Sequence, residues 1–372
     1  MREISNVEIN TLAKELDDVL KGARLQKFYE LGEGEFRLEF HAPGKGTLDL
    51  MVELKKRINL TRYVKPAPQT PTQFAMQIRK HLEGALAENT RQYGFDRVLV
   101  IEFNAQDGKK QLIIEMFSNG NMILLGEEGR IIACYRTEEW SDRVIKRGVK
   151  YIFPASTKID PREVDENKLR SILNEKKLIA CLAGRINLGT IYLEEVIARA
   201  KLAVDKQANK LNSDEITELL RAFSEICKAF EHPVPTAYFK DGKSFDYSIL
   251  PISKYASLES KQFRSISELL DEFYAPNSTM EEPKADKQFA EEKRKLEFAL
   301  KTQREAAENL RKKAEEAKQA GDKIYEHYSE LEALLRFVYS ARKSNKSWDE
   351  IEKVIKGKAE IDRTKGRIIV NI

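Results

Sequence analysis

A long charged stretch in the C-terminal part constrains this chain more than any other sequence feature. From Lys284 to Ala320 the residues are mostly lysine, glutamate, alanine and arginine, with almost no helix breaker. We therefore expect one uninterrupted helix, which at about 1.5 Å per residue spans roughly 50 Å. The sequence thus predicts an arm over 284–320, preceded by a polar, proline-bounded linker from Ala275 to Pro283.

The arm carries a weak heptad seam. Its members, spaced by seven, are Phe289, Leu296, Gln303, Leu310 and Ala317. Glutamine and alanine are poor core residues, so two alternatives stay open: a solvated single helix, or a helix that pairs, for example in a homodimer. We expect Gly321 to break the arm.

The residues after Gly321 show a stronger apolar stripe at alternating spacings of four and three. Its members are Ile324, Tyr328, Leu331, Leu335 and Val338. The tail from Asp362 to Ile372 is expected to form two short strands around Lys365-Gly366. We expect nothing to bury Ile368, Ile369 and Val370.

The N-terminal part alternates between helical and strand patterns, which favours an α+β domain over residues 1–160. Ser5 and Asn6, followed by Glu8, resemble a helix start, and Gly22 ends that helix. A second helix is expected from Thr72 through Leu86. The expected strands are 25–29, 36–40, 48–52, 98–103, 111–116, 121–125 and 131–135. Short glycine turns join the last four strands, which is typical of an antiparallel meander.

The next two segments, 161–232 and 233–274, are expected to be mainly helical and then a β-hairpin with one helix. Arg185 to Gly189 forms a tight turn between two helices. Such a turn could be a helix-hairpin-helix unit, in which the backbone of Asn187, Leu188 and Gly189 faces a phosphate. An ordinary corner between two helices has the same spacing.

Composition excludes several classes of protein. The net charge is only +4, so any basic footprint for nucleic acid must be local. The three cysteines and four histidines are scattered, which predicts neither a disulfide framework nor a metal site. No phosphate-binding loop or nucleophile elbow occurs, so we expect no catalytic residue and no cofactor. Without a secretory signal or a membrane-length apolar run, a cytoplasmic protein with no membrane partner is expected.

Two local clusters are candidates for nucleic-acid contact. Arg79-Lys80-His81 places three basic or titratable groups in a row on a helix, where some must point to solvent or to phosphate. Asp96 and Arg97 stand at the entry of a strand. They could form a structural salt bridge, or they could read a base edge through complementary donors and acceptors.

These stretches resemble the NFACT family, which includes bacterial RqcH and eukaryotic NEMF. The matching segments are Phe74 to Leu82, Asp96-Arg97-Val98, Leu112 to Met116, Ser118 to Leu124 and Leu188 to Glu195. They follow one another along essentially the whole chain, and the last has an archaeal-like form. The resemblance implies an N-terminal NFACT-N domain similar to the N-terminal fold of formamidopyrimidine-DNA glycosylases. It also implies that 284–320 is a coiled-coil arm and that 321–372 begins a middle domain.

The resemblance also implies a function. Family members bind large ribosomal subunits obstructed by peptidyl-tRNA and recruit tRNA, mainly alanyl-tRNA, for C-terminal tailing without mRNA. The ribosome supplies the peptidyl transfer. Carried over, the tRNA-binding residues are Asp96, Arg97 and Glu8, where the family usually has aspartate. The expected phosphate contacts nearby are Arg57, Arg79, Lys80 and His81. The family continues into the rest of the middle domain, a return helix and an RNA-binding domain.

A DNA-binding glycosylase or abasic-site lyase is the alternative from another class. Those glycosylases use a processed N-terminal proline as the nucleophile, followed by glutamate. Here Arg2 stands before Glu3, so the secondary amine that would form the Schiff base is missing. We therefore favour an adaptor over an enzyme.

Overall fold

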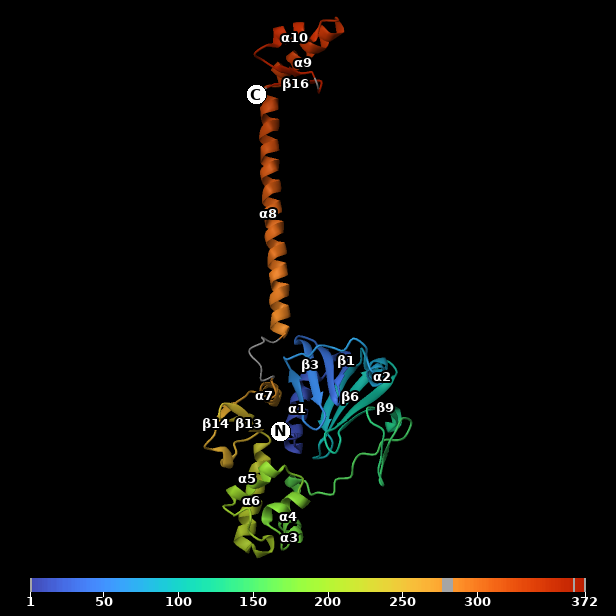
Figure 1. The fold of residues 1–372 in the computed structure, drawn as a ribbon, viewed down its shortest axis with the longest axis vertical. Coiled ribbons are helices and arrows are strands. Elements are labelled where there is room, and N and C mark those ends of the chain that lie inside the picture. Colours follow the sequence, from blue (N-terminus) through green and yellow to red (C-terminus); the bar gives the residue numbers. More distant parts are fainter. Residues whose placement is uncertain (1, 276–283, 364, 371–372) are drawn as a thin grey trace. The chain divides into compact units, whose positions relative to one another are not determined.

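The computed structural model describes residues 2–275, 284–363 and 365–370, and for 284–296 the backbone alone. The chain divides into two compact units, Met1–Asp286 and Lys287–Ile372. Each unit has a hydrophobic core of its own. The predicted α+β class is confirmed (Figure 1).

The N-terminal unit is built around a nine-stranded antiparallel sheet with the order β4-β3-β2-β1-β5-β6-β7-β8-β9. Its strands are β1 (Arg24–Gly32), β2 (Glu35–Ala42), β3 (Gly46–Glu53), β4 (Arg57–Thr61), β5 (Leu86–Gln92), β6 (Val98–Ala105), β7 (Gly108–Glu115), β8 (Asn121–Leu125) and β9 (Ile131–Cys134). Only the pair Arg24 and Leu86 joins β1 to β5, so the sheet has two halves. The halves share one core, in which the rings of Phe40 and Phe103 stack 6.3 Å apart.

Side-chain alternation explains how the half of the sheet formed by β5 to β9 is buried on both faces. In β6, Leu99 and Ile101 enter the large core, whereas Val98 and Val100 enter a smaller core on the other face. The predicted meander of β6 to β9 is confirmed by its antiparallel pairing. A two-stranded ribbon, β10 (Glu138–Glu139) and β11 (Val144–Ile145), lies beyond β9 in the sequence.

Helices α1 (Asn6–Leu20) and α2 (Gln73–Leu82) pack on this sheet. The predicted start of α1 is confirmed: Ser5 is the N-cap, and Glu8 completes a capping box. The expectation that the second helix runs through Leu86 was wrong. Gly84 adopts a positive φ of 86°, which turns the chain, and Leu86 begins β5 instead. Strands β4 and β5 had not been predicted.

The rest of the N-terminal unit contributes side chains to the same core. Its helices are α3 (Glu166–Ile172), α4 (Leu178–Arg185), α5 (Thr190–Arg199), α6 (Ser213–Ala229) and α7 (Ile266–Phe273). The predicted hairpin is β12 (Thr236–Lys240) with β13 (Lys243–Ser248), and β14 (Glu259–Gln262) adds a strand to β12. Helix α7 is tied to the end of β4, because Asp271 accepts hydrogen bonds from Thr61 (2.5 Å) and the Arg62 amide (2.9 Å).

The second unit contains α8 (Lys284–Glu326), α9 (Tyr328–Lys343), α10 (Trp348–Ile355) and a hairpin of β15 (Glu360–Asp362) and β16 (Arg367–Ile369). The long helix is confirmed, but the expected break at Gly321 was wrong, because α8 continues to Glu326. One glycine costs an exposed helix only about 1 kcal/mol relative to alanine, which the flanking helix formers outweigh. The expected linker, except Ala275, lies outside the described residues.

The end of the second unit forms a small core of its own. Val338, Ala341, Ile351 and Ile355 are buried in it. The expectation that nothing buries the tail was wrong in part. Ile368 and Val370 pack against this core, whereas Ile369 remains 48% exposed. Among the described residues, no helix is both long enough and apolar enough to cross a membrane.

Candidate nucleic-acid interface

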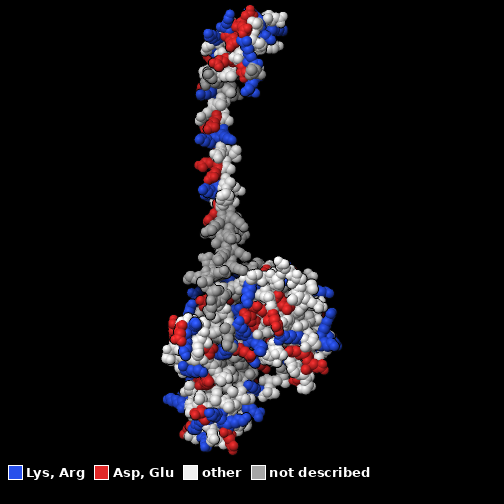
Figure 2. All heavy atoms as spheres, viewed as in Figure 1, with Lys and Arg blue, Asp and Glu red and all other residues white. Residues whose placement is uncertain are grey.

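A cleft of about 580 Å³ in the N-terminal unit brings distant segments together. We call it the N-terminal cleft. It is lined by Arg2 to Asn6, Asp96, Arg97, Phe117, Pro154 to Lys158, Ala183 and Asn187 to Ile191. Two sets of predicted site residues therefore meet here: the Asp96-Arg97 pair and the helix–helix turn 187–189. Basic and acidic side chains are intermixed over the face of the unit in Figure 2.

Buried amides join the two sets of predicted residues. The Asn6 side chain donates hydrogen bonds to the carbonyl oxygens of Phe95 (3.1 Å) and of Asn187. The Asn187 side chain donates to the same Phe95 carbonyl at 2.7 Å. Asn6 is 3% exposed, so these bonds are shielded from water. The start of α1 thereby holds the turn before Asp96 against the α4–α5 turn.

Gln92 fixes the same turn from the end of β5. Its side-chain amide donates to the carbonyl oxygens of Asn6 (2.8 Å) and Asp96 (2.7 Å), and its oxygen accepts a bond from Asn10 at 2.9 Å. Sequence reasoning missed both Gln92 and the bridging role of Asn6. No spacing pattern marks them, because most of their partners lie more than 80 positions away along the chain.

Asp96 and Arg97 are both half-buried, and they do not form a salt bridge with each other. The Arg97 amide donates to the Asp96 carboxylate at 2.7 Å, which fixes that carboxylate next to the cleft. The Arg97 guanidinium instead pairs with Glu3, with 2.6 Å between Nη1 and Oε2. The cleft thus presents an anionic acceptor and a cationic donor side by side, as recognition of a polar, charged ligand requires.

The α4–α5 turn is confirmed as a turn between two helices, and most of its amides are used internally. The Asn187 amide donates to Ile159 (2.8 Å) and the Leu188 amide donates to Ile186 (2.9 Å). Gly189 caps α5, and no side chain caps this helix. The first-turn amides of α5, which begins at Thr190, therefore carry the positive end of the helix dipole at the wall of the cleft.

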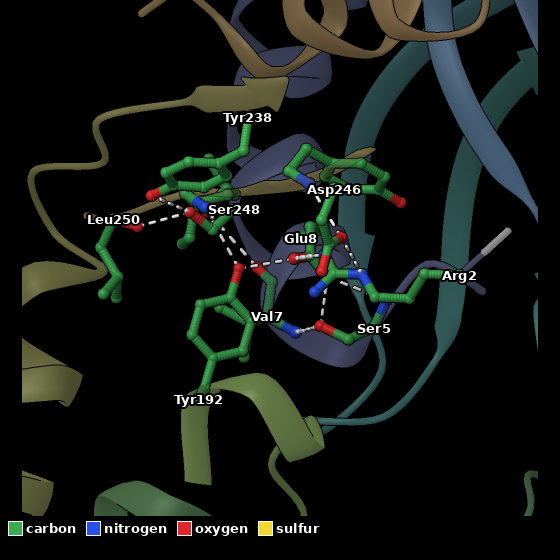
Figure 3. A network of polar contacts seen from close by, with 12 residues as sticks. Arg2, Ser5, Val7, Glu8, Tyr192, Tyr238, Asp246, Ser248 and Leu250 are labelled. Atoms are coloured by element: carbon green, nitrogen blue, oxygen red, sulfur yellow. Dashed lines mark hydrogen bonds and ion pairs between the residues drawn. The ribbon is translucent and has the colours of Figure 1, made fainter. Parts of the chain in front are cut away.

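Glu8 lies beneath the cleft rather than in it. Its side chain is fully buried and accepts hydrogen bonds from the Ser5 amide (2.9 Å) and Tyr192 (2.5 Å). It also pairs with Arg2, with 2.6 Å between Nη2 and Oε1 (Figure 3). Burial raises the pKa of the Tyr192 hydroxyl, and the neighbouring carboxylate of Glu8 raises it further. Glu8 therefore ties the N-terminal segment to α5, and its side chain has no exposed surface in this arrangement.

Arg2 continues this network toward β13. Its Nε lies 3.5 Å from Asp246, and its guanidinium lies 4.5 Å from the centre of the Tyr247 ring. The Tyr255 hydroxyl donates to Asp246 at 2.7 Å. Position 2 is thus held as a charged structural anchor, and its side chain provides no amine for Schiff-base chemistry.

The other predicted phosphate contacts do not line the cleft. Arg57 is buried and paired with Glu53, with 2.6 Å between the charged atoms. On α2, Arg79 donates to the Phe28 carbonyl at 2.8 Å and His81 lies 3.6 Å from Asp107. Lys80 is exposed. Figure 1 shows α2 at the opposite edge of this unit from α5, so the three residues of α2 belong to a different surface from the N-terminal cleft.

Comparisons with known proteins show which family this chain belongs to. Residues 5–365 match the family model of NFACT N-terminal and middle domains. The chain is 32% identical to the archaeal Rqc2 homolog aRqcH of Methanocaldococcus jannaschii, over 96% of this chain and 55% of that protein. Over 36% of the chain and 13% of the relative, it is 38% identical to ribosome quality control complex subunit 2 of Saccharomyces cerevisiae.

Two solved structures share the fold of the N-terminal part. The N-terminal structure of the fibronectin/fibrinogen-binding protein from Streptococcus suis has a TM-score of 0.56 and 26% identity, covering 73% of this chain and 98% of that one. The fibrinogen binding protein from Staphylococcus aureus has a TM-score of 0.61 at 20% identity, with the same coverage. The chain spans about half the length of its archaeal relative.

Proposed function

The chain belongs to the NFACT family, and from that premise we propose that it acts in ribosome-associated quality control. In this role it binds large ribosomal subunits obstructed by peptidyl-tRNA. It recruits tRNA, mainly alanyl-tRNA, so that the stalled chain is extended at its C-terminus without mRNA. The relatives whose names include ribosome quality control support this role.

The observation that carries the tRNA part of this proposal is the N-terminal cleft. Asp96 and Arg97 stand at its wall with a carboxylate and a guanidinium, and the first turn of α5 adds backbone donors. Carboxylate, guanidinium and helix N-terminus together offer acceptors and donors for base edges and phosphates. Asn6 and Gln92 hold these groups in one arrangement before any ligand arrives, which lowers the entropy cost of binding.

In this proposal the protein is an adaptor rather than an enzyme. Positioning two reactants raises the rate of their reaction without any catalytic side chain, because the entropy of orienting them is lost when they bind and not in the reaction step. The ribosome carries out peptidyl transfer, and the chain holds the incoming tRNA beside it. Glu8 contributes from below by fixing Arg2 and the start of α1, so we revise its role from direct contact to support.

The second unit is proposed to contact the large ribosomal subunit. Helix α8 runs without interruption from Lys284 to Glu326, roughly 65 Å at about 1.5 Å per residue. Such a helix can reach a site far from the tRNA. Leu310 on its seam is 67% exposed, so this face is open to a partner helix or to a second copy of the chain.

The test compares tRNA co-purification from the host between the wild-type chain and Asp96→Ala/Arg97→Ala. We expect the double variant to lose most of the bound tRNA. The matched control is Glu166→Ala/Arg170→Ala, which removes an acid and an arginine from an exposed pair on α3. The control should retain its tRNA. Equal recovery from the wild type and the cleft variant would contradict the site.

A further inference from the structure

We propose that Glu3 competes with RNA for Arg97, and thereby limits how tightly the N-terminal cleft binds polyanions. This inference rests on the proposed function, because it concerns the same ligand and the same cleft. It adds a residue that lies outside all of the NFACT-like segments named above. Glu3 acts as an internal substitute for a phosphate, and RNA must displace it to reach the arginine.

The geometry of Glu3 resembles that of a bridging phosphate. One carboxylate oxygen lies 2.6 Å from Nη1 of Arg97, and the other lies 3.8 Å from Nζ of Lys55. Arginine binds carboxylate and phosphate through the same donors. A phosphate in the cleft would therefore meet a guanidinium with one donor, Nη1, already occupied.

The position of Glu3 is fixed by its neighbours on both sides. Arg2 is anchored to buried Glu8, and Ile4 is fully buried, with its amide donating to the Lys55 carbonyl at 3.2 Å. The backbone on either side of Glu3 is therefore held. Little further backbone entropy is lost when its side chain pairs with Arg97.

The pair is nevertheless weak enough to be displaced. The side chains of Arg97 and Glu3 are 29% and 48% exposed, so water screens their attraction. Exposed ion pairs of this kind change an equilibrium by about two- to fivefold. Glu3 therefore acts as a moderate brake. A ligand that makes many contacts in the cleft can displace Glu3, whereas a polyanion that contacts only Arg97 loses affinity through the competition.

The experiment is a double-mutant cycle on the full chain. The dissociation constant for purified total tRNA is measured over a series of salt concentrations for the wild type, Glu3→Gln, Arg97→Ala and the combined variant. We expect Glu3→Gln to bind about two- to fivefold more tightly, with a salt dependence steeper by roughly 0.7 to 0.9 in log Kd per log salt. In the Arg97→Ala background most of this gain should vanish.

A charge-matched control separates competition from a general change in net charge. Glu128→Gln removes the same charge from a side chain that is 82% exposed and outside the cleft, and it should leave tRNA binding unchanged. If Glu3→Gln does not tighten binding, or tightens it equally with and without Arg97, the inference is overturned. If Arg97→Ala alone leaves tRNA binding unchanged, the proposed site fails as well.

Discussion

Replacing Glu8 by glutamine separates a supporting role from direct contact with tRNA. Glutamine keeps the shape of the side chain and can still occupy the N3 position of the capping box that begins at Ser5. It removes the charge that lies 2.6 Å from Arg2. The guanidinium would then depend on Asp246, whose oxygen lies 3.5 Å from its Nε.

The magnitude follows from burial. Removing one partner of a buried ion pair costs about 3–5 kcal/mol, because the other charge stays desolvated. Arg2 is 24% exposed and keeps a second carboxylate nearby, so we expect a loss just below this range, about 2–3 kcal/mol. For a unit of this size that loss lowers the melting temperature by roughly 3–5 °C.

The assay is differential scanning calorimetry of the full chain, with Asp96→Asn as the matched control. Asp96 is half-buried, and the hydrogen bond to its carboxylate from the Arg97 amide can be kept by asparagine. The melting temperature of the Asp96→Asn variant should differ little from that of the wild type. Below the melting transition Glu8→Gln should bind tRNA nearly as well as the wild type, whereas Asp96→Asn should not. Unchanged stability with lost tRNA binding in Glu8→Gln would refute the supporting role.

Three further predictions concern the close packing at Gly189, the reactivity of the Cys227 thiol and the helix propensity of position 321. A Cβ at Gly189 would lie 3.1 Å from Cβ of Ser5, so Gly189→Ala should destabilise the chain by about 1 kcal/mol and weaken tRNA binding. A Cβ at Gly184 meets open space, so the control variant Gly184→Ala should neither destabilise the chain nor weaken tRNA binding. Similar melting curves for the two variants would contradict this prediction. Burial and a nearby carboxylate raise the pKa of Cys227 to about 11, so its alkylation rate at pH 8, read by mass spectrometry, should be roughly two hundredfold below that of a free thiol and rise tenfold per pH unit. Gly321→Ala should stabilise α8 by about 1 kcal/mol, seen as a higher helix melting temperature in circular dichroism, because the glycine sits inside the helix.

Local patterns in the sequence predicted most elements of the fold. The strands of the meander, the start of α1 and the long helix α8 each depend on residues within a few positions of one another. The errors at Leu86 and Gly321 arose where a local preference was outweighed. A turn at Gly84 made Leu86 available to pair with Arg24, and long helical flanks carried α8 through Gly321.

The sequence by itself determined the repertoire of elements and the presence of Asp96 and Arg97, because periodicity, capping and motifs are written in neighbouring residues. Only the tertiary structure decided which groups face the cleft. Glu8 is buried because Tyr192, 184 positions away, closes over it, and Asn6 meets Asn187 across 181 positions. Whether a carboxylate supports a site or contacts a ligand depends on such distant packing, which no local pattern encodes.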